Sequence, residues 1–141
     1  MYVLDTDVNG IVQQGRGPLF ERLWARVSLH PISLFFVPIV SFHEQVMGWN
    51  TYASRARDQT GVRHAYLMFQ RVLTGFAAAQ VLPYDEAAAD HFVALRAQRV
   101  RIGTMDLRIA AIALAHGMTL LTRNLVDFRQ VPGLVAEDWT V

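Results

Sequence analysis

Cysteine and lysine are both absent from the 141 residues of this chain. Without cysteine there can be no disulfide bond, no thiolate metal site and no cysteine nucleophile. Without lysine, all 13 cationic side chains are arginines, whose planar group suits phosphate oxygens. Charged residues make up only 18% of the chain and the net charge is +1, so charge alone does not indicate a nucleic-acid partner.

Long hydrophobic runs are missing as well. No stretch reaches the ~18 apolar residues that a membrane-spanning helix needs. The first residues, from Met1 to Asp5, lack the basic segment of a signal peptide, so we expect a cytoplasmic protein that does not enter a membrane. Since 52% of the residues are hydrophobic, the chain has enough apolar surface for a packed core, and we expect residues 1–141 to form a single domain.

The remaining pattern alternates short apolar segments with amphipathic ones, which is typical of an α/β fold with a parallel sheet. Residues 105–116 are apolar on nearly every side, so this helix should be buried against the sheet, with Asp106 in its first turn. We expect Thr104 to cap it and Gly117 to end it. The expected strands are residues 2–4, 34–40, 81–82, 118–121 and 134–136, and the expected helices are residues 19–27 after Pro18, a helix starting at Ser41, residues 55–79 as one helix or two, a helix from its cap Asp85 to about residue 100, and residues 105–116.

Acidic residues follow the ends of several expected elements. Asp5 follows the first strand, Glu44 lies one turn into the helix after the second, and Asp127 lies beyond residues 118–121. The carboxyl ends of parallel strands lie at one edge of a sheet, and Asp106 lies at the same edge if its helix begins there. Carboxylates without cysteine or paired histidine suit Mg²⁺ or Mn²⁺ rather than zinc. The sequence therefore predicts a metal site able to support phosphodiester cleavage.

Each acid also has a purely structural explanation. Asp5 and Asp7 favour a turn after a strand. Ser41 and Glu44 match the capping box S-x-x-E, in which Glu44 would satisfy the amide of Ser41. Asp106 complements the dipole of its helix. The functional interpretation therefore depends on the joint placement of the acids at equivalent ends of successive strand–helix units.

Two other motifs begin at Asp5. The stretch from Asp5 to Gly10 fits the start of a calcium-binding EF-hand loop, but Arg16 stands where that loop needs glutamate. The same stretch resembles the D-x-D opening of haloacid-dehalogenase-like phosphatases, whose later lysine this chain lacks, and such a phosphatase is the alternative enzyme. The histidines show no metal-ligand spacing. Arginines that could line a phosphate path, or simply form a solvated face, are Arg96, Arg99, Arg101, Arg123 and Arg129.

Four motifs, in order along the chain, resemble the PIN-domain ribonucleases, and within that family the VapC-type toxins of type II toxin–antitoxin systems. The first opens with Asp5, the second ends at Glu44, the third contains Asp106 and the fourth leads to Asp127. They are residues 3–7, 40–44, 103–111 and 121–128, followed by a similar tail at residues 131–139. The likeness spans nearly the whole chain.

The resemblance implies a three-layer α/β/α sandwich around a mostly parallel sheet of about five strands. It also implies Mg²⁺- or Mn²⁺-dependent cleavage of RNA by an activated water, a homodimer, and a cognate antitoxin protein that blocks the site. A PIN-like binding module without turnover is the alternative outside enzymes. The implied catalytic metal ligands are Asp5, Glu44, Asp106 and Asp127, and the implied supporting residues are Thr6, Asp7, Thr122 and Asn124.

Two positions depart from the usual pattern of the family. Asp7 stands where the opening motif more often has Asn or Ser, which adds an acid to the site. In the fourth motif an acid or amide is expected at the position of Asn124, of Asp127, or of both. We favour Asp127 as the acid and Asn124 as an amide that orients water or metal.

Overall fold

The computed structural model describes residues 1–141 and has a sheet of five strands at its centre. All neighbouring strands pair in parallel, and their order is β3-β2-β1-β4-β5. The order reverses at β1, the central strand, so the edge beyond its carboxyl end is where ligands bind in sheets of this kind. The strands are β1 (Tyr2–Leu4), β2 (Phe35–Pro38), β3 (Val81–Leu82), β4 (Thr119–Leu121) and β5 (Ala136–Glu137).

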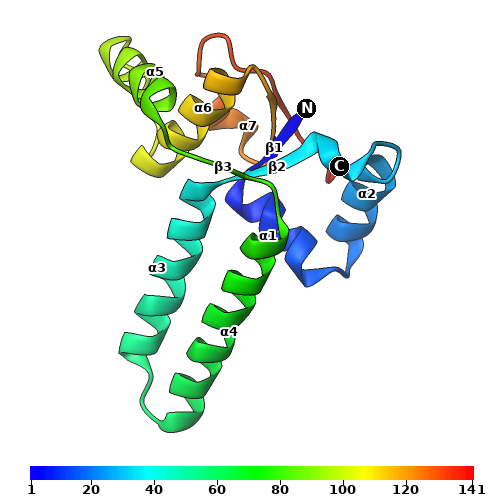
Figure 1. The fold of residues 1–141 in the computed structure, drawn as a ribbon, viewed down its shortest axis with the longest axis vertical. Coiled ribbons are helices and arrows are strands. Elements are labelled where there is room, and N and C mark those ends of the chain that lie inside the picture. The colour runs from blue at the N-terminus through cyan, green and yellow to red at the C-terminus, as the bar shows by residue number, and fades with distance from the viewer.

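Helices connect every pair of successive strands. Between β4 and β5 the connection contains only one short helix, α7, of a single turn. Two of the helices, α3 and α4, form a long antiparallel hairpin that projects from the rest of the fold (Figure 1). The helices are α1 (Thr6–Gln14), α2 (Pro18–Val27), α3 (Ile39–Arg55), α4 (Gln59–Ala78), α5 (Glu86–Ala97), α6 (Thr104–His116) and α7 (Leu125–Phe128), with a 3₁₀ turn at Ile32–Leu34.

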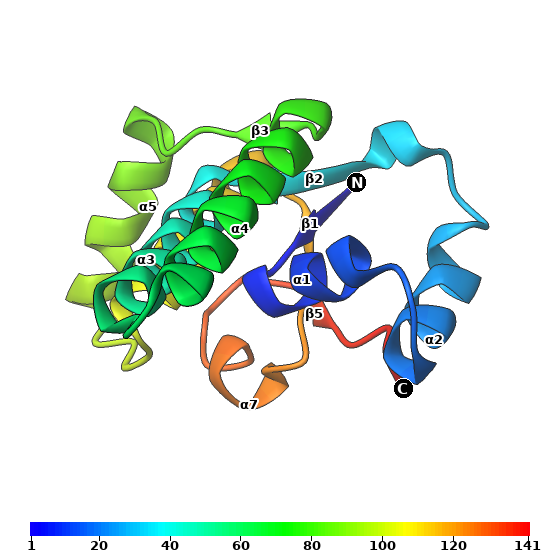
Figure 2. The same cartoon turned by 90° about the horizontal axis from the view of Figure 1, so that it is seen from below.

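The sheet is covered on both faces, which gives three layers. Successive strand residues point to opposite faces. Val3 and Leu120 belong to the core shared with α5, α6 and α7, whereas Leu4 and Leu121 belong to the core shared with α1, α2 and α4. Figure 2 shows α1, α2 and α4 on the near face of the sheet. The predicted α/β/α sandwich is therefore confirmed, and the sheet is wholly parallel.

Most predicted elements are present with small shifts at their ends. The buried helix is α6, which ends at Gly117 in the left-handed conformation as expected. The prediction that Thr104 caps it is wrong, because Thr104 is the first residue of the helix and Gly103 is its N-cap, without a side-chain hydrogen bond. Asp85 caps α5 as expected, but that helix stops at Ala97. The pattern at residues 55–79 forms one helix, α4, which spans Gln59–Ala78 and is capped by Asp58. The last strand lies at Ala136–Glu137, partly beyond the predicted residues 134–136.

The start of α3 differs from the prediction in a way that matters for the site. The apolar run at residues 34–40 gives a shorter strand, because a 3₁₀ turn takes up its first residue and α3 begins at Ile39. Pro38 is the N-cap and ends the strand. Ser41 is therefore inside the helix and does not start it.

Two helices were not predicted. Asp5 and Asp7 suggested a turn, but Asp5 is instead the N-cap of α1, whose first residue is Thr6. The second, α7, is only four residues long and is capped by Asn124. Asp7 and Asp127 thus lie in the first turns of short helices. None of the helices combines the length and hydrophobicity that crossing a membrane requires.

Candidate active site

Asp5 joins three elements at the carboxyl edge of the sheet. It follows β1, its N–H donates to the carbonyl of Leu121 in β4 at 2.9 Å, and its side chain caps α1. Oδ1 accepts the N–H of Thr6 at 2.7 Å, and Oδ2 accepts the hydroxyl of Thr122 at 2.7 Å. Only 6% of Asp5 is exposed, so these bonds fix a buried carboxylate.

The surroundings of Asp5 oppose its negative charge. Burial raises the pKa of Asp5 from 3.8 to about 7, because the ionised carboxylate loses hydration. The hydrogen bonds from Thr122 and Thr6 lower this pKa, while the charges of Asp7 and Asp106 raise it. A cation close to Asp5 would offset both the burial and the repulsion, so the site has a physical reason to bind one.

Asp106 interacts electrostatically with the other acids of the site. It lies in the first turn of α6. Its pKa is raised first by partial burial and then by the negative charges of Glu44, Asp127 and Asp7. The charge of Asp106 in turn acts on Asp5. The structure thus brings the predicted acids, which come from separate elements, within electrostatic reach of one another.

Glu44 lies in the second turn of α3 and bonds to α1. Its Oε1 accepts the hydroxyl of Thr6 at 2.6 Å, and the same hydroxyl lies 2.9 Å from Oγ of Ser41. The N-cap of α3 is Pro38 and no side chain caps the helix. The capping-box explanation of Glu44 is therefore wrong, because Ser41 is the third residue of the helix rather than its cap.

Asn124 and Asp127 form a closed pair at α7. The amide group of Asn124 donates to Oδ2 of Asp127 at 2.9 Å, and its Oδ1 accepts the Asp127 N–H at 3.4 Å. The N–H of Asn124 donates to Oγ1 of Thr122 at 3.0 Å, which links α7 to Asp5. This arrangement favours Asp127 as the acid of the fourth motif and Asn124 as the residue that holds it.

Asp7 and Arg123 form an ion pair at the rim of the site. Nη1 of Arg123 lies 3.9 Å from Oδ2 of Asp7, and both side chains are about half exposed. Burial raises the pKa of Asp7, although the nearby charge of Arg123 lowers it. Among the arginines proposed for a phosphate path, Arg123 is the one that forms an ion pair with a site acid, whereas Arg96 lies over the ring of Phe92.

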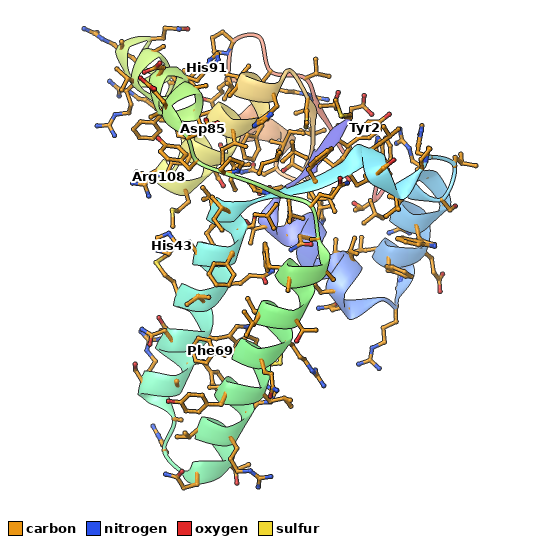
Figure 3. The ribbon with its side chains drawn as sticks, viewed as in Figure 1. Tyr2, His43, Phe69, Asp85, His91 and Arg108 are labelled. Atoms are coloured by element: carbon orange, nitrogen blue, oxygen red, sulfur yellow. The ribbon has the colours of Figure 1, made fainter.

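The donor set of the site consists of oxygen atoms. The structure contains no group of three or more His, Asp or Glu side chains already placed to hold one metal ion. Mg²⁺ keeps several waters and commonly binds through one or two protein carboxylates, so such a closed group is not required. His43, the neighbour of Glu44, is exposed and projects outward from α3 (Figure 3). The chemistry of the acids therefore fits Mg²⁺ or Mn²⁺.

Ser41 is the residue near the site that the sequence analysis misassigned. It is fully buried and its hydroxyl contacts Thr6, not the backbone at the helix start. The signal that could have corrected the assignment is Pro38, because proline cannot continue a central strand and is common where helices start. A helix starting just after Pro38 places Ser41 in its first turn, one turn before Glu44.

Comparison with known proteins gives relatives along nearly the whole chain. Ribonuclease VapC1 of Rickettsia felis is 30% identical over 135 residues, which cover 94% of this chain and 91% of that protein. The tRNA(fMet)-specific endonuclease VapC of Shigella flexneri is 39% identical over 74 residues, or 49% of this chain. That second match spans 56% of the relative, about half its length.

A solved structure shares the fold. A toxin–antitoxin complex from Klebsiella pneumoniae contains a chain that is 23% identical, with a TM-score of 0.66 and 96% of both chains covered. The family model described as PIN domain matches residues 11–134, a range that includes Glu44, Asp106 and Asp127 and begins after Asp5. The extent of that match, together with the Rickettsia felis relative, shows that this chain belongs to the PIN-domain family.

Proposed function

We propose that this protein is a Mg²⁺- or Mn²⁺-dependent endoribonuclease and the toxin of a toxin–antitoxin pair. The observation that carries the proposal is that acids from the end of β1, from α3 and from α7 lie within electrostatic reach of Asp106, in the first turn of α6. The ribonuclease names of the relatives support the reaction. The likeness to a chain of a toxin–antitoxin complex supports an antitoxin partner.

Each acid has a distinct part in this proposal. Asp5 and Asp106 would hold the ion, because each carries a charge that its surroundings oppose. Glu44 would hold a water or the ion with Oε2, since Thr6 occupies Oε1. Asp127 would complete the site, held by Asn124. When bound, Mg²⁺ or Mn²⁺ would neutralise the scissile phosphate and lower the pKa of the attacking water.

Arg123 has the geometry to bind a phosphate oxygen of the substrate. It lies at the rim, half exposed, at 3.9 Å from Asp7. Exposed ion pairs of this kind are weak, about 0–1 kcal/mol, so a phosphate can displace the carboxylate. A guanidinium binds phosphate through two parallel N–H donors. The substrate class would be single-stranded or looped RNA, whose phosphates are accessible.

The proposal is tested by incubating the purified protein with a labelled stem-loop RNA, with bulk tRNA and with p-nitrophenyl phosphate. We expect cleavage of RNA in Mn²⁺ or Mg²⁺, products with 5′-phosphate ends, and no reaction in EDTA. tRNA is a natural first substrate because the Shigella flexneri relative is a tRNA(fMet)-specific endonuclease.

The outcomes separate the alternatives. Hydrolysis of p-nitrophenyl phosphate without RNA cleavage would favour a phosphatase. RNA binding without cleavage in any divalent metal would favour a PIN-like binding module. Equal cleavage in EDTA and in Mn²⁺ would contradict the metal dependence.

A further inference from the structure

Three side chains form a hydrogen-bonded chain that links the interior of α3 to the site. Oγ of Ser41 lies 2.9 Å from Oγ1 of Thr6, and Oγ1 of Thr6 lies 2.6 Å from Oε1 of Glu44. Ser41 and Glu44 are three residues apart on α3, so they share one face of that helix. Thr6 is the first residue of α1, directly after Asp5.

The donor and the acceptor in each of these two hydrogen bonds follow from the chemistry of the three side chains. An ionised carboxylate has no hydrogen to donate, so Glu44 must accept from Thr6. A hydroxyl has only one hydrogen, so Thr6 has none left for Ser41. The bond between the two hydroxyls is therefore donated by Ser41 and accepted by Thr6.

The burial of Ser41 keeps this order of donors and acceptors in place. Ser41 is 0% exposed, so water does not compete for its hydroxyl, and every buried polar side-chain atom in the structure has a partner. By donating to Thr6, Ser41 leaves the single hydrogen of Thr6 pointing at Glu44. Hydrogen bonds in such a series also polarise and strengthen one another.

We propose that Ser41 is a positioning residue that acts through Thr6 to fix the carboxylate of Glu44 for metal binding. One oxygen of Glu44 is held by Thr6, whereas Oε2 accepts no hydrogen bond within the protein, and the charge of Glu44 acts on Asp106. This inference rests on the proposed function for the identity of the ion. It extends that function to a buried residue outside the acidic cluster.

The test compares Ser41→Ala, Thr6→Val and the double variant with the wild type. The Mn²⁺ dissociation constant is measured by isothermal titration calorimetry, and kcat and KM for RNA cleavage are measured at saturating Mn²⁺. We expect Ser41→Ala to weaken Mn²⁺ binding by about 10-fold, which is the size of effect found for residues that orient metal ligands. We expect kcat to fall with little change in KM, because RNA does not contact Ser41.

The double variant tests whether Ser41 acts through Thr6. Once the hydroxyl of Thr6 is absent, removing that of Ser41 should weaken Mn²⁺ binding no further. Thr6→Ser, which keeps a hydroxyl, should recover most of the affinity that Thr6→Val loses. Additive losses in the double variant would overturn the proposed route.

Val40→Ala is the matched control for simple loosening of α3. Val40 is buried next to Ser41 in the same turn but packs into the hydrophobic core. We expect it to lower the melting temperature at least as much as Ser41→Ala while Mn²⁺ binding stays at the wild-type value. Weakened Mn²⁺ binding in Val40→Ala would overturn the inference, since the Ser41 effect would then be general.

The inference and the proposed function fail in different ways. A wild type that binds Mn²⁺ but cuts no RNA contradicts the nuclease proposal, and the Mn²⁺ dissociation constants still decide the role of Ser41. A Ser41→Ala variant that binds Mn²⁺ and cuts RNA as the wild type does contradicts the inference alone. A wild type that binds no Mn²⁺ contradicts both.

Discussion

At the scale of the residue, the acids of this site differ in how firmly the protein holds them. Both oxygens of Asp5 accept hydrogen bonds, from Thr6 and from Thr122. Asp106 accepts no hydrogen bond from a side chain, and its pKa is raised by partial burial and then by the charges of neighbouring acids. Replacing Asp5 by Asn therefore removes one of these bonds as well as the charge, because Asn keeps only one acceptor oxygen, whereas replacing Asp106 removes mainly the charge.

Glu44→Gln separates the charge of Glu44 from its shape. Gln keeps an oxygen that can accept the Thr6 hydroxyl, so we expect the melting temperature to stay within about 2 °C of the wild type, as for a change of less than ~0.5 kcal/mol. It removes the charge that a metal or its water would use, so we expect RNA cleavage in saturating Mn²⁺ to fall by about 10- to 100-fold, the range found when the groups around a metal are changed. Equal cleavage rates on the same RNA would return Glu44 to a structural role.

The acids themselves were predictable from the sequence, but their surroundings were not. Asp5, Glu44 and Asp127 follow strand ends, and that placement alone brings them to one edge of a parallel sheet. The misassigned residue is Ser41, because S-x-x-E matches a capping box whether or not the helix starts there. Only the position of the helix start, one residue after Pro38, decides between the two.

At the scale of the element, two of the acids, Asp7 and Asp127, lie on the short helices α1 and α7. The four-residue α7 is too short to be stable by itself and depends on its cap. α1 contains Asn9 and Gly10, which have low helix propensity, so its sequence resembles a turn. This explains why these two helices were missed while α6, with its continuous apolar surface, was found.

Asn124→Ala tests whether the cap of α7 holds Asp127. We expect a loss of about 1 kcal/mol in the free energy of unfolding, the usual cost of losing such a cap. Cleavage should fall as well, because Asp127 also loses the bond from the Asn124 amide. Asp85→Ala is the control, since Asp85 caps α5 by accepting the Ala88 N–H at 3.0 Å. It should cost similar stability and leave cleavage unchanged.

Two outcomes would contradict the role of Asn124 in holding Asp127 for cleavage. If Asn124→Ala and Asp85→Ala lose equal stability and both cleave RNA at the wild-type rate, Asn124 serves only the helix. If both lose cleavage equally, the loss reflects general instability. Melting curves and initial rates on the same preparations distinguish these cases.

At the scale of the whole molecule, the site opposes folding unless a cation is present. The pKa of Asp5 is raised from 3.8 to about 7, and those of Asp7 and Asp106 are raised as well. The native state therefore holds protons that the unfolded chain releases. The stability contributed by these groups is fully present below about pH 4 and is lost as the pH rises towards 7.

This linkage predicts how melting depends on pH and metal. Without metal, the protein should melt at a lower temperature at pH 8 than at pH 5.5, with a loss of about 2 kcal/mol from Asp5. Mn²⁺ should raise the melting temperature, and more at pH 8 than at pH 5.5, because it binds the ionised acids of the folded site. Scanning calorimetry with EDTA or with millimolar Mn²⁺ measures both effects. Superimposable melts would contradict a metal site.

The most direct test of the account is Asp106→Asn, measured for melting and for RNA cleavage on one preparation. Asp106 is repelled by Glu44, Asp127 and Asp7, so removing its charge should leave the metal-free protein at pH 8 as stable as the wild type or more stable. The same change should abolish Mn²⁺-dependent cleavage, because an acid proposed to hold the metal ion loses its charge. A variant that melts no lower and cuts no RNA is the predicted result. Wild-type cleavage by Asp106→Asn in Mn²⁺ would contradict the assignment of the site.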